Sequence, residues 1–161
     1  MVQRIQTLFL ILSAIALVAL AFFPIANFTN APGVEGATAY YIFTIFEISD
    51  GVGGSPFSFW FTLPLIVIPA AIAILSIVAV FLYKNRPEQI RLTQTGIFLN
   101  ILLVVGILFF YIERIESVTQ TTANYEYVGI YLPLISLVFL VLAHRFIRRD
   151  EKLVRSIDRL R

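Results

Sequence analysis

The chain has 161 residues, of which 59% are hydrophobic and only 14% are charged, and its mean hydropathy is +0.89. A soluble domain typically has about 25% charged residues, and a soluble protein this small has too much surface to bury so many apolar side chains. The composition excludes a soluble enzyme, a disordered chain and an ordinary nucleic-acid-binding domain, and it predicts a membrane protein with several spans. The absence of Cys and the presence of a single His exclude disulfides and thiolate metal sites.

Four apolar segments predict four transmembrane helices, at about 5–23, 57–83, 92–112 and 127–147. The first segment is the shortest, and a helix of its length reaches about 28 Å, close to the thickness of the hydrocarbon layer. A signal peptide is the alternative for this segment, but its length and the lack of a small-residue cleavage site favour an uncleaved span. We therefore expect an all-α membrane bundle over residues 1–147.

The distribution of basic residues predicts the orientation of the bundle. With four spans, all of the 12 Lys and Arg side chains except Arg114 fall on one side of the membrane. Cytoplasmic loops carry the excess of Lys and Arg, so both termini are expected in the cytoplasm. The opposite side holds most of the carboxylates, which are Glu35, Glu47, Asp50, Glu113, Glu116 and Glu126.

The two loops on the acidic side, at 24–56 and 113–127, are expected to form a small extracytoplasmic cap that contains β-structure. Residues 37–49 are rich in β-branched and aromatic side chains, and residues 117–122 are also typical of a strand. Residues 24–36 are instead rich in turn residues. Because an isolated two-stranded hairpin is only marginally stable, we expect strands from both loops to join one sheet. A helix that re-enters the membrane is the alternative for residues 37–49.

The predicted spans contain almost no ionisable residues away from their ends, whereas transporters usually carry such residues inside the membrane. Asn100 is expected to join two helices through an interhelical hydrogen bond, with substrate binding as the alternative. Other polar side chains expected within the hydrocarbon layer are Thr62, Ser76 and Ser136. The pattern predicts no catalytic residues, no metal ligands and no cofactor.

Residues 148–161 are expected to form a basic amphipathic tail that continues the fourth span as a cytoplasmic helix, because apolar residues recur there at helical spacing. Its partner is an anionic lipid surface, a cytoplasmic protein or, as a weaker alternative, ribosomal RNA; DNA is not expected. The tail residues expected to make these contacts are Arg148, Arg149, Lys152, Leu153, Arg155, Ile157, Arg159 and Leu160. On the outer side, the aromatic residues expected to contact another membrane protein are Tyr40, Tyr41, Phe43 and Phe46.

Two segments carry a resemblance to a known family. The chain reads QRIQTL at 3–8 and DEKLVRSIDRLR at 150–161. These strings resemble small four-span inner-membrane proteins of Bacteroidota, a family known only as a domain of unknown function, and the resemblance covers essentially the full chain. It implies a location in the bacterial cytoplasmic membrane, and it offers no catalytic residues to carry over.

These observations predict a non-enzymatic accessory or scaffold subunit of a bacterial inner-membrane complex, with protein export or envelope biogenesis as its setting. The alternative is a small transporter or channel subunit, which would need Thr62, Ser76 and Asn100 to converge on a wet cavity. A lipid-modifying enzyme is a weaker alternative, because the chain offers no obvious nucleophile, base or metal ligands at the membrane surface.

Overall fold

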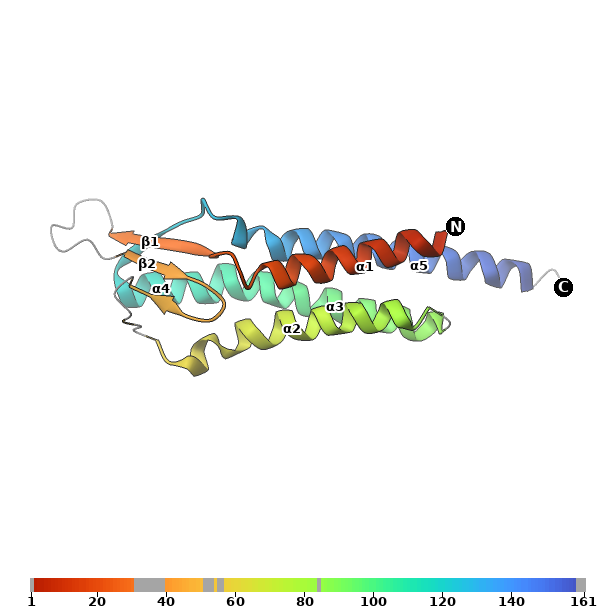
Figure 1. Ribbon diagram of the computed structural model, residues 1–161, viewed down its shortest axis with the longest axis horizontal. Coiled ribbons are helices and arrows are strands. Elements are labelled where there is room, and N and C mark those ends of the chain that lie inside the picture. The colour runs from red at the N-terminus through yellow and green to blue at the C-terminus, as the bar shows by residue number, and fades with distance from the viewer. Residues whose placement is uncertain (1, 31–39, 51–53, 55–56, 84, 159–161) are drawn as a thin grey trace.

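A computed structural model of the chain describes residues 2–30, 40–50, 54, 57–83 and 85–158, with side chains described except at 2–4, 30 and 154–158. The described part is mostly helical and elongated, with a small sheet at one end and both termini towards the other (Figure 1). The sheet lies at the end that the sequence predicts to be the cap.

Four helices lie side by side along the long axis of the described part: α1 (Val2–Ala19), α2 (Phe59–Phe81), α3 (Arg86–Val105) and α5 (Leu132–Asp158) (Figure 1). The helices α1 and α3 each pack on both α2 and α5, which closes a four-helix bundle. Buried positions follow the three- and four-residue spacing of one helix face. On α3 these positions are Gln89, Thr93, Gly96, Asn100 and Leu103.

Three helical segments are long and apolar enough to cross a membrane, and they indicate a multi-pass membrane protein. They are Phe59–Phe81, Arg86–Thr119 and Val128–Leu153, and a shorter apolar helix, Ile5–Ala19, precedes them. Many large apolar side chains on these helices are exposed, including Phe98 at 68% and Phe81 at 75%. Such surfaces fit a lipid environment rather than water.

The cap contains an antiparallel sheet with the strand order β3-β2-β1-β4. The first loop supplies β1 (Ala26–Asn30), β2 (Tyr40–Phe43) and β3 (Ile48–Ser49), and the second supplies β4 (Thr121–Asn124). The prediction of one sheet from both loops is confirmed, and a re-entrant helix is wrong for the described residues 40–49. The prediction that residues 24–36 form turns was wrong at β1, which pairs with both β2 and β4 and so joins the two loops.

The third helix continues further than the sequence predicts. After α3 the chain forms a π-helical turn, η1 (Gly106–Tyr111), and then α4 (Ile112–Thr119). The strand predicted at 117–122 was therefore wrong at its start, since its first three residues belong to α4. The helix ends where Gln120 takes the left-handed conformation (φ 53°), which turns the chain into β4.

The fourth long helix begins after a short 3-10 turn, η2 (Val128–Ile130), and continues without a break from Leu132 to Asp158. The prediction that the tail extends the last apolar segment as a helix is confirmed as far as Asp158. The side chains of Arg155 and Ile157, and residues Arg159 and Leu160 as a whole, lie outside the described part of the chain.

Candidate interaction surfaces

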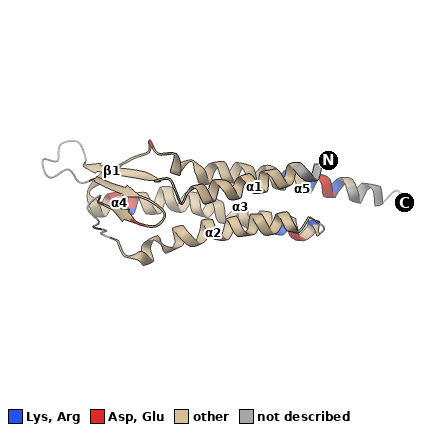
Figure 2. Ribbon diagram, viewed as in Figure 1, with Lys and Arg blue, Asp and Glu red and all other residues tan. Residues whose placement is uncertain are grey.

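Charged side chains gather at the two ends of the bundle and leave its middle uncharged (Figure 2). At the end opposite the cap, α3 and α5 carry the described basic residues Arg86, Arg91, Arg145, Arg148, Arg149 and Lys152. The cap end carries the described carboxylates Glu47, Asp50, Glu113, Glu116 and Glu126, with Arg114 as the basic exception. We call these two regions the basic end and the cap.

The aromatic residues predicted as outer contacts separate into exposed and buried ones. Tyr40 is 40% exposed and Phe46 is 51% exposed, whereas Tyr41 is half-buried. Phe43 is fully buried, and its ring lies 6.2 Å from that of Tyr111. Phe43 therefore belongs to the core between the sheet and the bundle, because its strand points alternate side chains inward, and it cannot serve as a surface contact.

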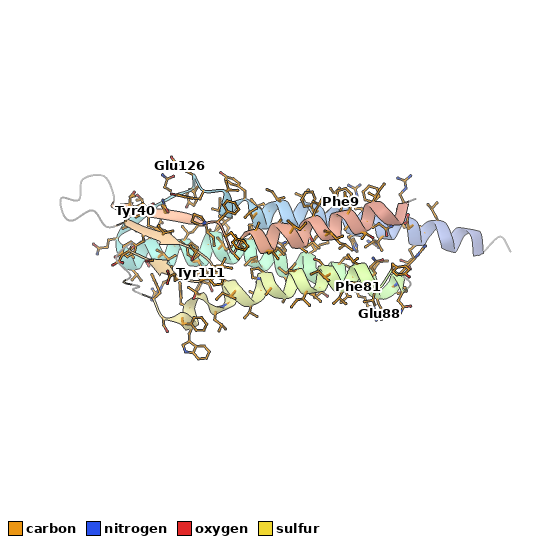
Figure 3. The ribbon with its side chains drawn as sticks, in the orientation of Figure 1. Phe9, Tyr40, Phe81, Glu88, Tyr111 and Glu126 are labelled. Carbon is orange, nitrogen blue, oxygen red and sulfur yellow. The ribbon has the colours of Figure 1, made fainter. Side chains whose placement is uncertain are left out.

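A buried amide in β1 holds two tyrosines of the cap, and the sequence reasoning missed it. Asn27 donates through Nδ2 to the hydroxyl oxygens of Tyr40 and Tyr127, each at 2.6 Å. Figure 3 shows Tyr40 at the cap end of the molecule. The hydrogen bond with Tyr127 is the largest of the causes that raise the pKa of Tyr40 above its usual 10.0. The cluster fixes one exposed aromatic side chain of the outer surface.

The π-helical turn changes which side chains face the cap core. A regular helix that buries Leu103 and Ile107 would next bury positions 110 and 114. The structure instead buries Tyr111 and Ile115, and it leaves Phe110 and Arg114 exposed. The extra residue of η1 thus keeps a charged side chain out of the core. It also lets Tyr111 donate its hydroxyl to the Phe61 carbonyl oxygen at 2.9 Å.

At the basic end, Asp150 joins three helices rather than facing the solvent. Its carboxylate accepts a hydrogen bond from Gln6 Nε2 of α1, and its carbonyl oxygen accepts one from Arg86 of α3 at 3.1 Å. Asp150 is only 9% exposed. A buried carboxylate needs such partners. The tail therefore presents less acidic surface than its sequence implies.

Two arginines of α5 flank a cleft at the basic end. Arg145 and Arg149 line it together with Leu142 and Phe146, and its volume is about 390 Å³. Arg148, Lys152 and Leu153 are exposed nearby, with Leu153 at 54%. Of the tail residues that were predicted to make contacts, Arg149 alone among those described lines this cleft, and Arg145 was not among the predicted contacts.

Polar side chains inside the bundle bond to neighbouring helices in separate pairs. Asn100 donates through Nδ2 to the Ser136 hydroxyl at 3.1 Å, which joins α3 to α5. Ser13 donates to the Ser76 hydroxyl at 3.2 Å, which joins α1 to α2. Thr62 instead donates to the Phe59 carbonyl oxygen of its own helix. Within the described residues, no hydrogen bond joins the Asn100–Ser136 pair to the Ser13–Ser76 pair.

Within the described residues, no three His, Cys, Asp or Glu side chains lie close enough together to hold a metal ion. The single His, His144, has its Nδ1 atom 3.1 Å from the Thr93 hydroxyl, which joins α5 to α3. The geometry thus offers two exposed surfaces and a set of helix-joining polar contacts.

Neither a curated protein nor a solved structure matches the chain. The profile of one family matches residues 2–160, which is nearly the whole chain. The chain therefore belongs to the family described as Domain of unknown function (DUF4293).

Proposed function

We propose that α1 is a fourth membrane span, and that both termini face the cytoplasm of a bacterium whose inner membrane holds the protein. The 18 residues of α1 reach about 27 Å, close to the roughly 30 Å of the hydrocarbon layer. α1 also packs along two helices that are long enough to cross. The excess of Lys and Arg at the basic end supports a cytoplasmic position for that end.

We further propose that the protein is a non-enzymatic accessory or scaffold subunit of an inner-membrane complex, with protein export or envelope biogenesis as its setting. One observation carries this proposal: exposed aromatic and basic side chains lie at the two ends of the bundle. Inside the bundle, by contrast, Asn100 bonds to Ser136 and Ser13 bonds to Ser76, and these contacts join the helices. Tyr40 places exposed aromatic surface on the cap, and the exposed Phe46 lies beside α1 and α2, in a hollow that Val18 and Ile66 also line. Exposed apolar surface of this kind marks contacts with other proteins.

A small transporter or channel subunit is the second candidate, and one atom favours it. The Oδ1 atom of Asn100 is buried in the bundle and has no hydrogen-bond partner among the residues that the structure describes. A water or a passing solute would satisfy it. Modification of a Ser136→Cys variant by a small water-soluble thiol reagent would support this candidate, and protection of the thiol in the folded protein would oppose it.

The accessory-subunit proposal is tested by purification from native membranes in mild detergent, followed by mass spectrometry of what elutes with the tagged chain. We expect a companion protein in a fixed ratio. Phe46→Ala and a truncation before Arg148 each remove one proposed surface. Phe98→Ala is the matched control, because it also removes an exposed Phe ring but lies on the lipid-facing side of α3.

The companion is expected to be lost or reduced in at least one surface variant and retained in Phe98→Ala. An aromatic residue central to an interface typically contributes about 2 kcal/mol or more, which weakens binding about thirtyfold. Recovery of the wild-type chain as a lone monomer would refute the proposal. Equal retention by every variant would show that neither surface makes the contact.

A further inference from the structure

The cleft at the basic end has the shape and chemistry of a site for an anionic amphiphile. Arg145 and Arg149 lie four residues apart and so share one face of α5. Leu142 and Phe146 supply the apolar part of the same lining. Leu142 lies nearest the apolar first half of α5 and Arg149 furthest from it, so the lining changes from apolar to cationic along the helix axis.

The two guanidinium groups have no anionic partner in the part of the chain that the structure describes. The ion pair found there is Arg91 with Glu88, on α3. Asp150, the acidic residue next to Arg149, directs its carboxylate to Gln6 instead. Like charges four residues apart on a helix repel each other, so an anion between Arg145 and Arg149 would relieve that repulsion.

In the proposed four-span arrangement, with the start of α5 at the outer membrane surface, the cleft lies near the inner lipid headgroups. Arg149 follows the first residue of α5, Leu132, by 17 positions, which is about 26 Å along the helix and close to the roughly 30 Å of the hydrocarbon layer. Phe146 stacks on Phe9 of α1, with ring centroids 5.6 Å apart. Phe9 is labelled on α1 in Figure 3, and its ring also stacks on Phe139 of α5. This apolar wall offers a surface for an acyl chain below the headgroup.

We propose that this cleft binds one anionic phospholipid, with Arg145 and Arg149 contacting its phosphate and Leu142 and Phe146 contacting its acyl chain. Arginine suits this role because its planar guanidinium group can donate two parallel hydrogen bonds to phosphate oxygens. The inference goes beyond the proposed function, since a bound lipid requires no partner protein. The site also distinguishes two pairs of basic residues on α5. Arg145 and Arg149 line the cleft, whereas Arg148 and Lys152 are exposed but do not line it.

Native mass spectrometry in detergent tests the proposal, because a micelle without charged lipid has no anionic surface to attract the tail. Purified protein is mixed with phosphatidylglycerol or, in a second arm, with zwitterionic phosphatidylcholine. We expect wild type to retain one phosphatidylglycerol in preference to phosphatidylcholine. The double variant Arg145→Gln, Arg149→Gln is expected to lose this preference by about tenfold or more, from the contribution of each basic residue near an anionic lipid.

The matched control is Arg148→Gln, Lys152→Gln, which removes the same charge from the same helix and should retain the lipid as wild type does. Equal loss in both double variants would show diffuse attraction to the tail and overturn the site. Displacement of the lipid by inorganic phosphate at similar concentrations would overturn the lipid assignment, because the acyl chain would then add nothing. The lipid assignment would also be overturned if wild-type protein retained no phosphatidylglycerol.

A charge-preserving variant keeps the proposal testable if the Gln variant does not fold. Arg145→Lys, Arg149→Lys retains both charges but loses the two-pronged geometry of the guanidinium group. We expect it to elute as wild type does in size-exclusion chromatography and to bind phosphatidylglycerol several-fold more weakly. Lipid retention equal to that of wild type in this variant would refute the contact between the arginines and the phosphate.

Discussion

Gly129 lies in η2, where the chain enters α5 and passes against the first loop, so Gly129→Ala tests how closely the cap and the bundle are joined. A Cβ atom at this position would lie 2.2 Å from the Pro24 carbonyl oxygen and 2.7 Å from the carbonyl carbon. Both are backbone atoms, so no side-chain rotation can make room. The two segments would have to separate by about 1 Å to reach an ordinary contact distance.

Pro24 cannot move alone, because the next residue donates its N–H to the sheet. Ile25 N lies 2.7 Å from the Phe43 carbonyl oxygen, beside the β1–β2 pair. Overpacking typically costs about 1–3 kcal/mol, and a backbone clash at this joint should fall in the upper half of that range, about 2–3 kcal/mol. For a chain of this size about 2–4 °C is lost per kcal/mol, so we expect the unfolding temperature to fall by about 4–12 °C.

The assay is the fraction of protein that remains monodisperse in detergent after heating, measured by size-exclusion chromatography. Gly106→Ala is the control, because a Cβ there meets no heavy atom within 4 Å. Alanine is also the better helix former by up to about 1 kcal/mol, so the control should be as stable as wild type or slightly more stable. An unfolding temperature for Gly129→Ala within about 1 °C of wild type would refute the packing argument.

Three further predictions follow from single contacts. Asn100→Leu combined with Ser136→Ala should leave the unfolding temperature unchanged or raise it, since the two changes remove both hydrogen-bonding groups and the Asn100 oxygen that has no partner among the described residues. A loss of several degrees would contradict this. Deleting Leu108 from η1 should restore the regular helix and turn Arg114 towards the core, so the yield of folded protein should fall sharply. A yield equal to that of wild type would show that folding does not need the extra residue. The raised pKa of Tyr40 stabilises the folded protein fully below about pH 10, and this contribution is lost as pH rises through the raised value. Amide exchange of the cap strands should therefore accelerate above about pH 10. In Tyr40→Phe this acceleration should be smaller than in wild type. An equal acceleration in wild type and variant would exclude this tyrosine as the cause.

The helices and the position of the sheet could be predicted because both follow from local sequence. Long apolar runs and the segregation of Lys and Arg indicate spans and sides without any tertiary information. The β-branched and aromatic run at 37–49 likewise predicted strands, and its described residues 40–49 contain β2 and β3. The central strand β1 could not be predicted, since its short sequence ANFTN resembles a turn and its pairing partners are distant in the chain. Strand identity here depends on cross-strand neighbours rather than on local preference.

The candidate surfaces could be predicted only in part. Tyr40 and Phe46 are exposed as expected, but Phe43 is buried because its side chain points inward and its ring packs against Tyr111 of η1. Asp150 appears in the sequence as one of several tail charges, and only the approach of Gln6 and Arg86 shows that it is a buried acceptor. One feature of the sequence indicates the π-helical turn. A regular helix would place the charged Arg114 on its buried face, and the extra residue of the turn avoids this.

The proposed function requires the cap and the basic end to face opposite sides of the membrane, with α1 as a crossing segment. The chain has no Cys, so single-cysteine variants can be labelled without background. Val2→Cys, Thr29→Cys and Lys152→Cys sample the start of α1, strand β1 and the basic end. A membrane-impermeant maleimide applied to spheroplasts should label Thr29→Cys alone, with the other two labelled only after permeabilisation. Labelling of Val2→Cys in intact spheroplasts, together with Thr29→Cys, would show that α1 does not cross and would contradict the four-span arrangement.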